Sequence, residues 1–215
     1  MSKVVKKATP AEVVQLRADQ TTNAGEGTLN ESLPYTVAVT IKGVSPILFH
    51  RWNVEAVETK AKAAKGSAAK KNDDTESYLY RTDDGEIALP GEYLRQAIIT
   101  AAKFKQDPRS PRKSASDLFK AGVVSLTELA SLGVNQPDFL DRRRVQVQRS
   151  GITRVRPAMN AGWAAEIELM VNLPEYINEV LLRQVLDDAG RLIGVGDFRP
   201  TYGRFSIVQF KVREV

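Results

Sequence analysis

The side chains that could carry chemistry in this 215-residue chain are mostly arginines rather than nucleophiles or metal ligands. The chain has no cysteine and a single histidine, His50. Thiolate metal sites, disulfides and cysteine nucleophiles are therefore excluded, and a zinc site or a catalytic triad would depend on His50 alone. We expect no metal site, no cofactor and no catalytic group, with His50 as the one alternative.

A glycine-rich segment near the end of the sequence, residues 194–210 (GVGDFRPTYGRFSIVQF), combines a permissive backbone with flat and cationic side chains. Glycine lets the main chain turn tightly and approach a ligand closely. Aromatic rings and guanidinium groups suit bases and phosphates, so the segment predicts a nucleic-acid-binding loop. The alternative is a plain turn before a final strand. The candidate residues are Gly194, Gly196, Phe198, Arg199, Tyr202, Gly203 and Arg204.

A second segment, residues 142–157 (RRRVQVQRSGITRVRP), contains six arginines and no acidic residue. Its alternating pattern on both sides of a Ser150-Gly151 turn predicts a β-hairpin whose first strand gathers arginines and glutamines on a common face. Uncompensated like charges repel one another, so an anionic partner explains the segment better than a solvated edge ribbon. The candidate contacts are Arg142, Arg144, Gln146, Gln148, Arg154 and Arg156.

The charge of the whole chain agrees with this interpretation, since the formal net charge is +5 at pH 7 and the pI is about 9.4. A moderate basic bias is typical of nucleic-acid-binding proteins but does not by itself define a site. Two further basic stretches, Lys60–Lys71 and Arg109–Lys113, are secondary candidates for phosphate contacts. Each of them also fits an ordinary solvated surface.

The elements that must position these side chains follow from hydrophobic periodicity. The expected elements are a strand at 35–42, a helix at 91–103, a strand at about 122–127, a strand at 163–171, a helix at 174–191 and a strand at 204–213. The second helix is expected to carry Ile177, Leu181, Val185, Ala189 and Leu192 along one side. The order β-α-β-β-α-β predicts an α+β fold with a ferredoxin-like or RRM-like core, basic insertions and a protruding β-hairpin. A further small hairpin, 78–89, is expected around Asp83-Asp84-Gly85.

The domain organisation follows from the same pass along the chain. Residues 1–33 are expected to form a mobile N-terminal arm, and residues 34–215 a single RRM-like domain with insertions at about 54–77, 104–121 and 128–160. The sequence has no secretory signal pattern and no apolar stretch as long as a membrane span, so we expect a cytoplasmic protein without membrane contact.

Three short motifs occur in the predicted core: KGVSPIL at 42–48, LPGEYLRQAIITAA at 89–102 and GVGDFRPTYGRF at 194–205. Together they resemble the RAMP superfamily of CRISPR-associated RNA-binding proteins, and most of all the backbone subunits that line guide RNA in surveillance complexes. Glu92 and Tyr93 stand where the family's PGSSLKGALR-type segment has serines, and Phe198 and Tyr202 stand where the family has smaller residues. The hairpin at 142–157 is similar to the thumb-like hairpin that reaches across bound RNA.

The resemblance implies non-catalytic binding of single-stranded nucleic acid, RNA in the first place, along its phosphate backbone. Successive copies would pack side by side as a homo-oligomer or within a multi-subunit ribonucleoprotein, with little base preference. Single-stranded DNA offers the same phosphates and bases. Two alternatives stay open: a RAMP-type endoribonuclease that uses His50 as general acid or base, and an oligomeric scaffold protein.

Overall fold

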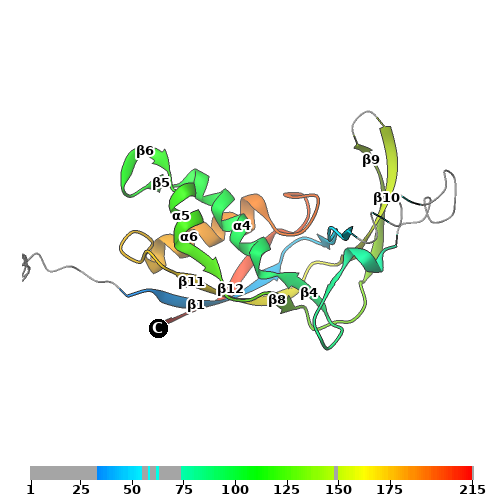
Figure 1. Cartoon of the computed structure of the whole chain (residues 1–215), viewed down its shortest axis with the longest axis horizontal. Coiled ribbons are helices and arrows are strands. Elements are labelled where there is room, and N and C mark those ends of the chain that lie inside the picture. The colour runs from blue at the N-terminus through cyan, green and yellow to red at the C-terminus, as the bar shows by residue number, and fades with distance from the viewer. Residues whose placement is uncertain (1–32, 55–57, 59–61, 63–73, 148–149, 215) are drawn as a thin grey trace, which may run out of the picture. The chain divides into compact units, whose positions relative to one another are not determined.

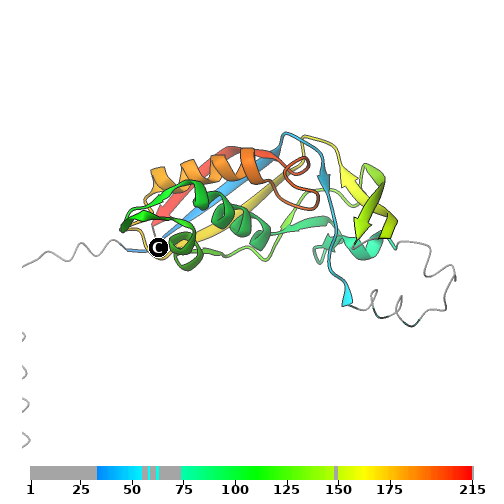
Figure 2. The ribbon, with the colours of Figure 1, turned by 90° about the horizontal axis from the view of Figure 1, so that it is seen from above.

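The computed structural model describes residues 33–54, 58, 62, 74–147 and 150–214. Its core is a four-stranded antiparallel sheet in the order β12 (Phe205–Glu214), β1 (Tyr35–Gly43), β11 (Ala164–Val171), β7 (Val123–Ser125). The helices α4 (Gly91–Ala101), α5 (Ser116–Gly122) and α6 (Glu179–Asp188) cover one face of this sheet (Figures 1 and 2). The chain order β1-α4-β7-β11-α6-β12 confirms the predicted α+β, ferredoxin-like arrangement.

Strand β1 shows why the alternation in its sequence becomes a core strand. Tyr35, Val37, Val39 and Ile41 are all buried beneath the helices, as the period of two along a strand requires. The strand ends at Gly43, where an added Cβ would lie 2.1 Å from Nε1 of Trp163. Only glycine fits there, because the indole of Trp163 lies against the backbone and donates from Nε1 to the carbonyl oxygen of Ser45 at 2.9 Å.

Helix α4 begins at the expected Pro90-Gly91 pair. The N–H of Gly91 donates to the carbonyl oxygen of Glu128 at 3.0 Å, and a Cβ on Gly91 would lie 2.1 Å from the carbonyl oxygen of Thr127. The glycine therefore allows the 125–128 segment to pack against the start of the helix. The predicted apolar stripe is confirmed, since Leu94, Ala97, Ile98 and Ala101 are buried.

Helix α6 is shorter than the predicted helix at 174–191. The side chain of Asn178 caps it by accepting from the N–H of Leu181 at 2.9 Å, so the helix begins at Glu179. Its last turn continues as a π-helical segment, η3 (Ala189–Ile193). Leu192, the last residue of the predicted stripe, is 38% exposed, whereas Val185 and Ala189 are buried. The wider π turn adds a residue and shifts Leu192 away from the buried stripe.

Two smaller sheets extend the core. One has the order β2 (Ile47–Leu48), β10 (Ser150–Met159), β9 (Phe139–Val147), and the other β3 (Tyr80–Arg81), β4 (Ile87–Pro90), β8 (Leu129–Ser131). The predicted small hairpin is confirmed by β3 and β4, with Gly85 at φ +81° in the connection. The expected Ser150-Gly151 turn is wrong, because these two residues pair with Val147 and Gln146. Residues 148–149, between the paired strands, lie outside the described residues.

The predicted insertions differ in what can be described. The stretch 104–121 contains a two-stranded ribbon, β5 (Gln106–Asp107) and β6 (Ser110–Ser114), followed by α5. Short 3-10 segments, η1 (Glu76–Tyr78) and η2 (Ala102–Phe104), join the elements. The expected arm at 1–33 falls almost entirely on residues 1–32, outside the description, and so does Lys60–Lys71 apart from the exposed Lys62. No helix among the described residues is long and apolar enough to cross a membrane.

Candidate nucleic-acid interface

The β9–β10 hairpin divides its arginines between two faces. Arg154 pairs directly with Arg143, and Arg156 with Asp141. Since residues directly opposite one another in an antiparallel pair share a face, these four form one surface, which we call the inner face. The other surface, the outer face, holds Arg142, Arg144, Thr153 and Val155. The expected common face of Arg142 and Arg144 agrees with this register, but Arg154 and Arg156 lie on the opposite side.

On the inner face, Arg143 connects the hairpin to the glycine-rich loop. Its Nε lies 2.6 Å from Oδ2 of Asp141, and its Nη2 donates to the hydroxyl of Tyr202. The guanidinium carbon is 4.9 Å from the ring centroid of Phe198 and 4.9 Å from that of Tyr202. The hydrogen bonds to Asp141 raise the pKa of Arg143 above its ordinary value, so this cation is permanent.

Arg156 makes a second connection between the same two parts. Its Nε lies 2.7 Å from Oδ2 of Asp197, and its guanidinium is 5.6 Å from the ring centroid of Phe198. The side chain is only 6% exposed. Neither Nε nor Nη1 makes a well-directed hydrogen bond within the described part of the chain. Arg156 is a predicted phosphate contact, and in the structure it is buried and paired with Asp197 of the loop.

The backbone of the loop is fixed to strand β2 and its flanks. The N–H of Asp197 donates to the carbonyl oxygen of Leu48 at 2.9 Å, and the N–H of Gly203 donates to that of Pro46 at 2.8 Å. Within the loop, the N–H of Val195 donates to the carbonyl oxygen of Gly203 at 2.9 Å. A Cβ on Gly203, at φ +73°, would lie 1.7 Å from the carbonyl oxygen of Val195. The plain-turn interpretation therefore holds for this glycine: it is required by packing.

The other two candidate glycines serve the same purpose. Gly194 and Gly196 adopt φ values of +77° and +81°, which side chains other than glycine rarely accept. The N–H of Gly194 donates to the carbonyl oxygen of Ala189 at 2.8 Å. The N–H groups of Gly194 and Gly203 are thus used inside the protein and are not available to a bound strand.

The loop presents its aromatic side chains at the surface. Phe198 is 42% exposed and has a φ of +59°, which is uncommon for a residue other than glycine and concentrated at binding sites. Its N–H donates to Oδ1 of Asp197 at 2.9 Å, which stabilises this conformation. Phe198 and Tyr202 meet edge to face, with ring centroids 6.2 Å apart. Arg199 follows Phe198 and is exposed.

His50 lies at the edge of the inner face. Its Nε2 is 2.6 Å from Nη1 of Arg154, and its ring is 4.7 Å from the ring of Tyr78. A guanidinium N–H only donates, so Nε2 is the acceptor and carries no proton in this arrangement. Of the two ring nitrogens, Nε2 is thus occupied by Arg154.

The remaining candidates lie apart from this cluster. Arg142 and Arg144 are exposed on the outer face. Arg204 is exposed at the end of the loop, where its N–H donates to Oγ of Ser45 at 2.9 Å. Gln148 lies outside the described residues, and Gln146 is described only in its backbone pairing with Gly151.

Three residues of the cluster were missed from the sequence: Arg143, Asp141 and Asp197. Arg143 belongs to the arginine run, but its face depends on the pairing register. Asp141 precedes the run by one residue, and strand β9 begins earlier, at Phe139. Asp197 stands inside the glycine-rich motif, and its carboxylate is the one acidic signal that would have indicated a buried arginine nearby.

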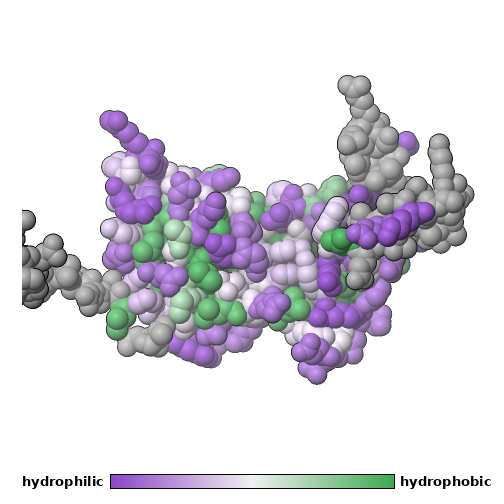
Figure 3. All heavy atoms as spheres, in the orientation of Figure 1, coloured by the Kyte–Doolittle hydropathy of each residue, from purple (hydrophilic) through white to green (hydrophobic). Residues whose placement is uncertain are grey.

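The surface around the cluster is mixed in polarity. In the space-filling view, apolar green areas are small and interrupted by hydrophilic purple ones on the face shown (Figure 3). A cavity of about 470 Å³ borders the loop and is lined by Thr100, Leu192, Ile193 and residues 196–200. Among the described residues, no group of three or more histidine, cysteine or acidic side chains could hold a metal ion.

Comparisons with known proteins leave the family open. No protein-family model matches the sequence, and no curated protein matches it. Among solved structures, the chain is similar to one in "Cryo-EM structure of the Type III-B Cmr-beta bound to cognate target RNA". The identity is 10% and the TM-score is 0.46, over 96% of this chain and 68% of that chain. This likeness is a distant one of fold.

Proposed function

We propose that this protein binds single-stranded nucleic acid, RNA in the first place, along its phosphate backbone and without catalysis. The observation that carries the proposal is the meeting of the hairpin with the glycine-rich loop, through Arg143 on Phe198 and Tyr202. This contact joins the arginine-rich hairpin to the exposed ring of Phe198. Proteins that bind single strands combine these two features: a positive surface that follows the phosphates and aromatic rings on which bases stack.

The exposed side chains have distinct roles in this proposal. Phe198 stacks on a base, since 42% of its surface is open to solvent. Arg154 and Arg199 contact phosphates beside it, because both are at least partly exposed and neither is paired with a carboxylate within the described part of the chain. Arg142 and Arg144 extend the positive surface on the outer face of the hairpin. Arg143 and Arg156 hold the surface in place.

Several copies would bind one strand side by side, as the resemblance to RAMP backbone subunits implies. Among the described residues of the interface, one copy offers the exposed ring of Phe198 and a few arginines without a carboxylate partner. The affinity of one copy is therefore low, and neighbouring copies on the same strand increase it. Electron microscopy with and without an oligonucleotide of many binding sites tests this part. Filaments or arcs that need the oligonucleotide are expected, and single particles at every ratio would contradict it.

The proposed mode is binding alone, because Nε2 of His50 accepts from Arg154. An endoribonuclease that used Nε2 for proton transfer with a 2′-hydroxyl would have to break this hydrogen bond. Incubation of the protein with labelled RNA is expected to leave the RNA intact. Cleavage that disappears in His50→Ala, with binding retained, would replace the proposal by the nuclease alternative.

The decisive experiment is a salt titration of binding to oligonucleotides of equal length, in RNA and DNA arms. If phosphates carry the interaction, the logarithm of the affinity falls linearly with the logarithm of salt, by about 0.7 per neutralised phosphate. A flat dependence would contradict the proposal and favour the scaffold alternative. The Arg213→Ala variant is a matched control, since it removes an exposed arginine from β12, away from the hairpin.

A further inference from the structure

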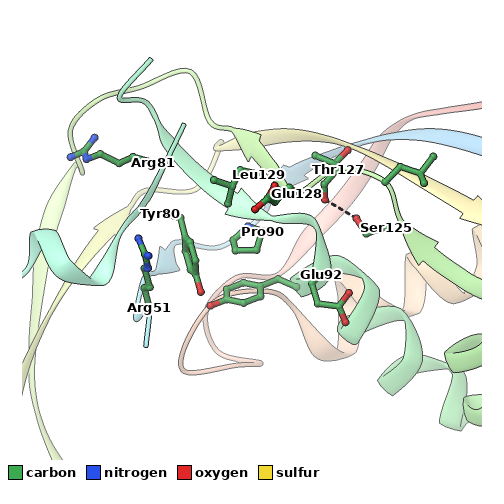
Figure 4. A pocket seen from close by; sticks show the side chains of 11 residues that line it. Arg51, Tyr80, Arg81, Pro90, Glu92, Ser125, Thr127, Glu128 and Leu129 are labelled. Carbon is green, nitrogen blue, oxygen red and sulfur yellow. Dashed lines mark hydrogen bonds between the residues drawn. The ribbon is translucent and has the colours of Figure 1, made fainter. Parts of the chain in front are cut away.

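A second cavity lies where β3, β4, the start of α4 and the 125–129 segment come together (Figure 4). Its volume is about 740 Å³, within the range of sites that hold small molecules. The cavity is formed by the β3–β4 hairpin on one side and by the 125–129 segment on the other, and Gly91 lets that segment approach the helix. Its walls include Arg51, Tyr80, Pro90, Tyr93, Leu126 and Glu128.

The aromatic wall consists of Tyr80 and Tyr93. Their ring centroids are 6.0 Å apart, edge to face. Burial, together with a hydrogen bond to Tyr80, raises the pKa of Tyr93 above its ordinary value, so the hydroxyl of Tyr93 stays protonated. The guanidinium of Arg51 lies over Tyr80, 5.0 Å from the ring centroid, and Figure 4 shows the two side by side. Within the described residues, no carboxylate pairs with Arg51, so its charge is available to an anion.

The acidic side chains that line the cavity differ in whether their carboxylates already accept hydrogen bonds from the protein. Oε1 of Glu92 accepts from Arg95 at 2.8 Å and from Gln96 at 2.6 Å, so this carboxylate is occupied. The carboxylate of Glu128 has no hydrogen-bond or ion-pair partner in the part of the chain that the structure describes. Leu126, 48% exposed, supplies an apolar surface nearby. The cavity therefore combines flat rings, an available cation and one available acceptor.

The side of the cavity formed by Arg51, Tyr80 and Tyr93 borders the proposed interface. Arg51 directly follows His50, which contacts Arg154 on the inner face of the hairpin. On the same side, the charges of Arg199 and Asp197 in the glycine-rich loop act on the hydroxyl of Tyr93. A strand held by Arg154 and Arg199 therefore passes within reach of the cavity.

We propose that this cavity is a base-recognition pocket that takes one base of the bound strand and prefers a base with an exocyclic amino group. The inference rests on the proposed function. The base packs against Tyr80 and Tyr93, Arg51 contacts the adjoining phosphate, and Glu128 accepts from the amino group. A carboxylate accepts from the amino group of cytosine but meets a carbonyl oxygen in uracil. The pocket thus adds a base preference to an interface that otherwise follows the backbone.

The test compares binding of cytidine and uridine homopolymers of equal length, about twelve nucleotides each. These bases have the same ring size and differ at the group that faces Glu128. The wild-type protein is expected to bind the cytidine strand about tenfold more tightly, the value of one charged hydrogen bond. In Glu128→Gln this ratio should fall towards one while the salt dependence stays unchanged. Glu166→Gln, an equal charge change at an exposed position of β11, should keep the ratio.

The outcomes separate this inference from the proposed function. Salt-dependent binding with equal affinities for the two strands, or with a ratio that Glu128→Gln does not change, overturns the pocket alone. Absence of salt-dependent binding overturns both. A second measurement on the wild-type protein needs no variant: light-induced crosslinking to a strand of 5-iodocytidine should modify Tyr80 or Tyr93. Adducts confined to Phe198 and Tyr202 would overturn the pocket assignment.

Discussion

The glycine-rich loop and the β9–β10 hairpin form one surface, but different parts of the chain fix their side chains. The loop is held by its main chain, through hydrogen bonds to Pro46 and Leu48 and through glycines with no room for a Cβ. The hairpin places its arginines by strand alternation, so neighbours such as Arg142 and Arg143 face opposite ways. Substitutions that alter the main chain should therefore disturb the loop. The position of each hairpin arginine depends instead on the side chains that share its face of the hairpin.

The largest loss of stability is expected when a methyl group is added at Gly203 in the loop. Gly203→Ala places a Cβ 1.7 Å from the carbonyl oxygen of Val195 at φ +73°. We expect the free energy of unfolding to fall by about 3 kcal/mol or more, from backbone strain and overpacking together. Gly85→Ala is the matched control, because its φ is +81° with nothing within 4 Å of the added Cβ. In urea denaturation, Gly85→Ala should lower the free energy of unfolding by about 1 kcal/mol. Equal losses in the two variants would contradict the proposed difference in packing.

A smaller loss of stability is expected when Arg156, on the inner face, loses the carboxylate that pairs with it. Asp197→Asn leaves the buried guanidinium of Arg156 without a carboxylate. The free energy of unfolding should fall by about 2 kcal/mol, less than for a fully buried pair because Asp197 is one-third exposed. Asp187→Asn breaks the exposed pair with Arg183 and should cost under about 0.5 kcal/mol. Denaturation curves that do not distinguish the two variants would show that Arg156 is not a structural cation.

The ring of the loop is expected to act on binding rather than on stability. Phe198→Ala removes the exposed ring and should weaken binding to a single strand about tenfold, the value of stacking one base. The salt dependence should stay as in the wild-type protein, because no charge is lost. Phe104→Ala removes a 65% exposed ring next to the β5–β6 ribbon and should leave affinity unchanged. Equal effects of both variants in fluorescence anisotropy would remove the specific role of Phe198.

The smallest effect is expected from the outer face. Arg144→Ala should weaken binding only about threefold and reduce the salt slope by about 0.7, as for one phosphate contact. The free energy of unfolding should change by less than about 0.5 kcal/mol, since the side chain is exposed. An unchanged slope would restrict the interface to the inner face and the loop.

The sequence predicted the core because each long element carries a complete period of its pattern. The alternation of Tyr35 to Ile41 and the stripe from Leu94 to Ala101 each identify their element and its buried side. Strands of two or three residues, such as β2 and β8, are too short for a pattern and form only because longer strands pair with them. Leu192 departs from the predicted apolar stripe because a π turn changes the phase of the helix.

The sequence predicted the two segments that form the candidate site, but not which of their side chains contact one another. Composition located the arginine-rich stretch and the glycine-rich loop. Which arginines face the loop depends on the register of the two strands, and in that register Ser150 and Gly151 pair with Val147 and Gln146 instead of forming the turn. The cavity beside Tyr80 depends on contacts among β3, β4 and the 125–129 segment, which are distant in sequence. Arg51 and Tyr80 are single residues in the sequence, and only the folded structure shows that they line the same cavity.

The contact of Arg143 with both aromatic rings has a kinetic consequence. Because the cation, Phe198 and Tyr202 are already held together in the unbound protein, little conformational entropy remains to be lost when a strand arrives. A preorganised surface of this kind is expected to lengthen the lifetime of the complex more than it speeds its formation. Weakening the contact, for example in Tyr202→Phe, should therefore shorten the residence time of the bound strand while the association rate stays close to that of the wild-type protein.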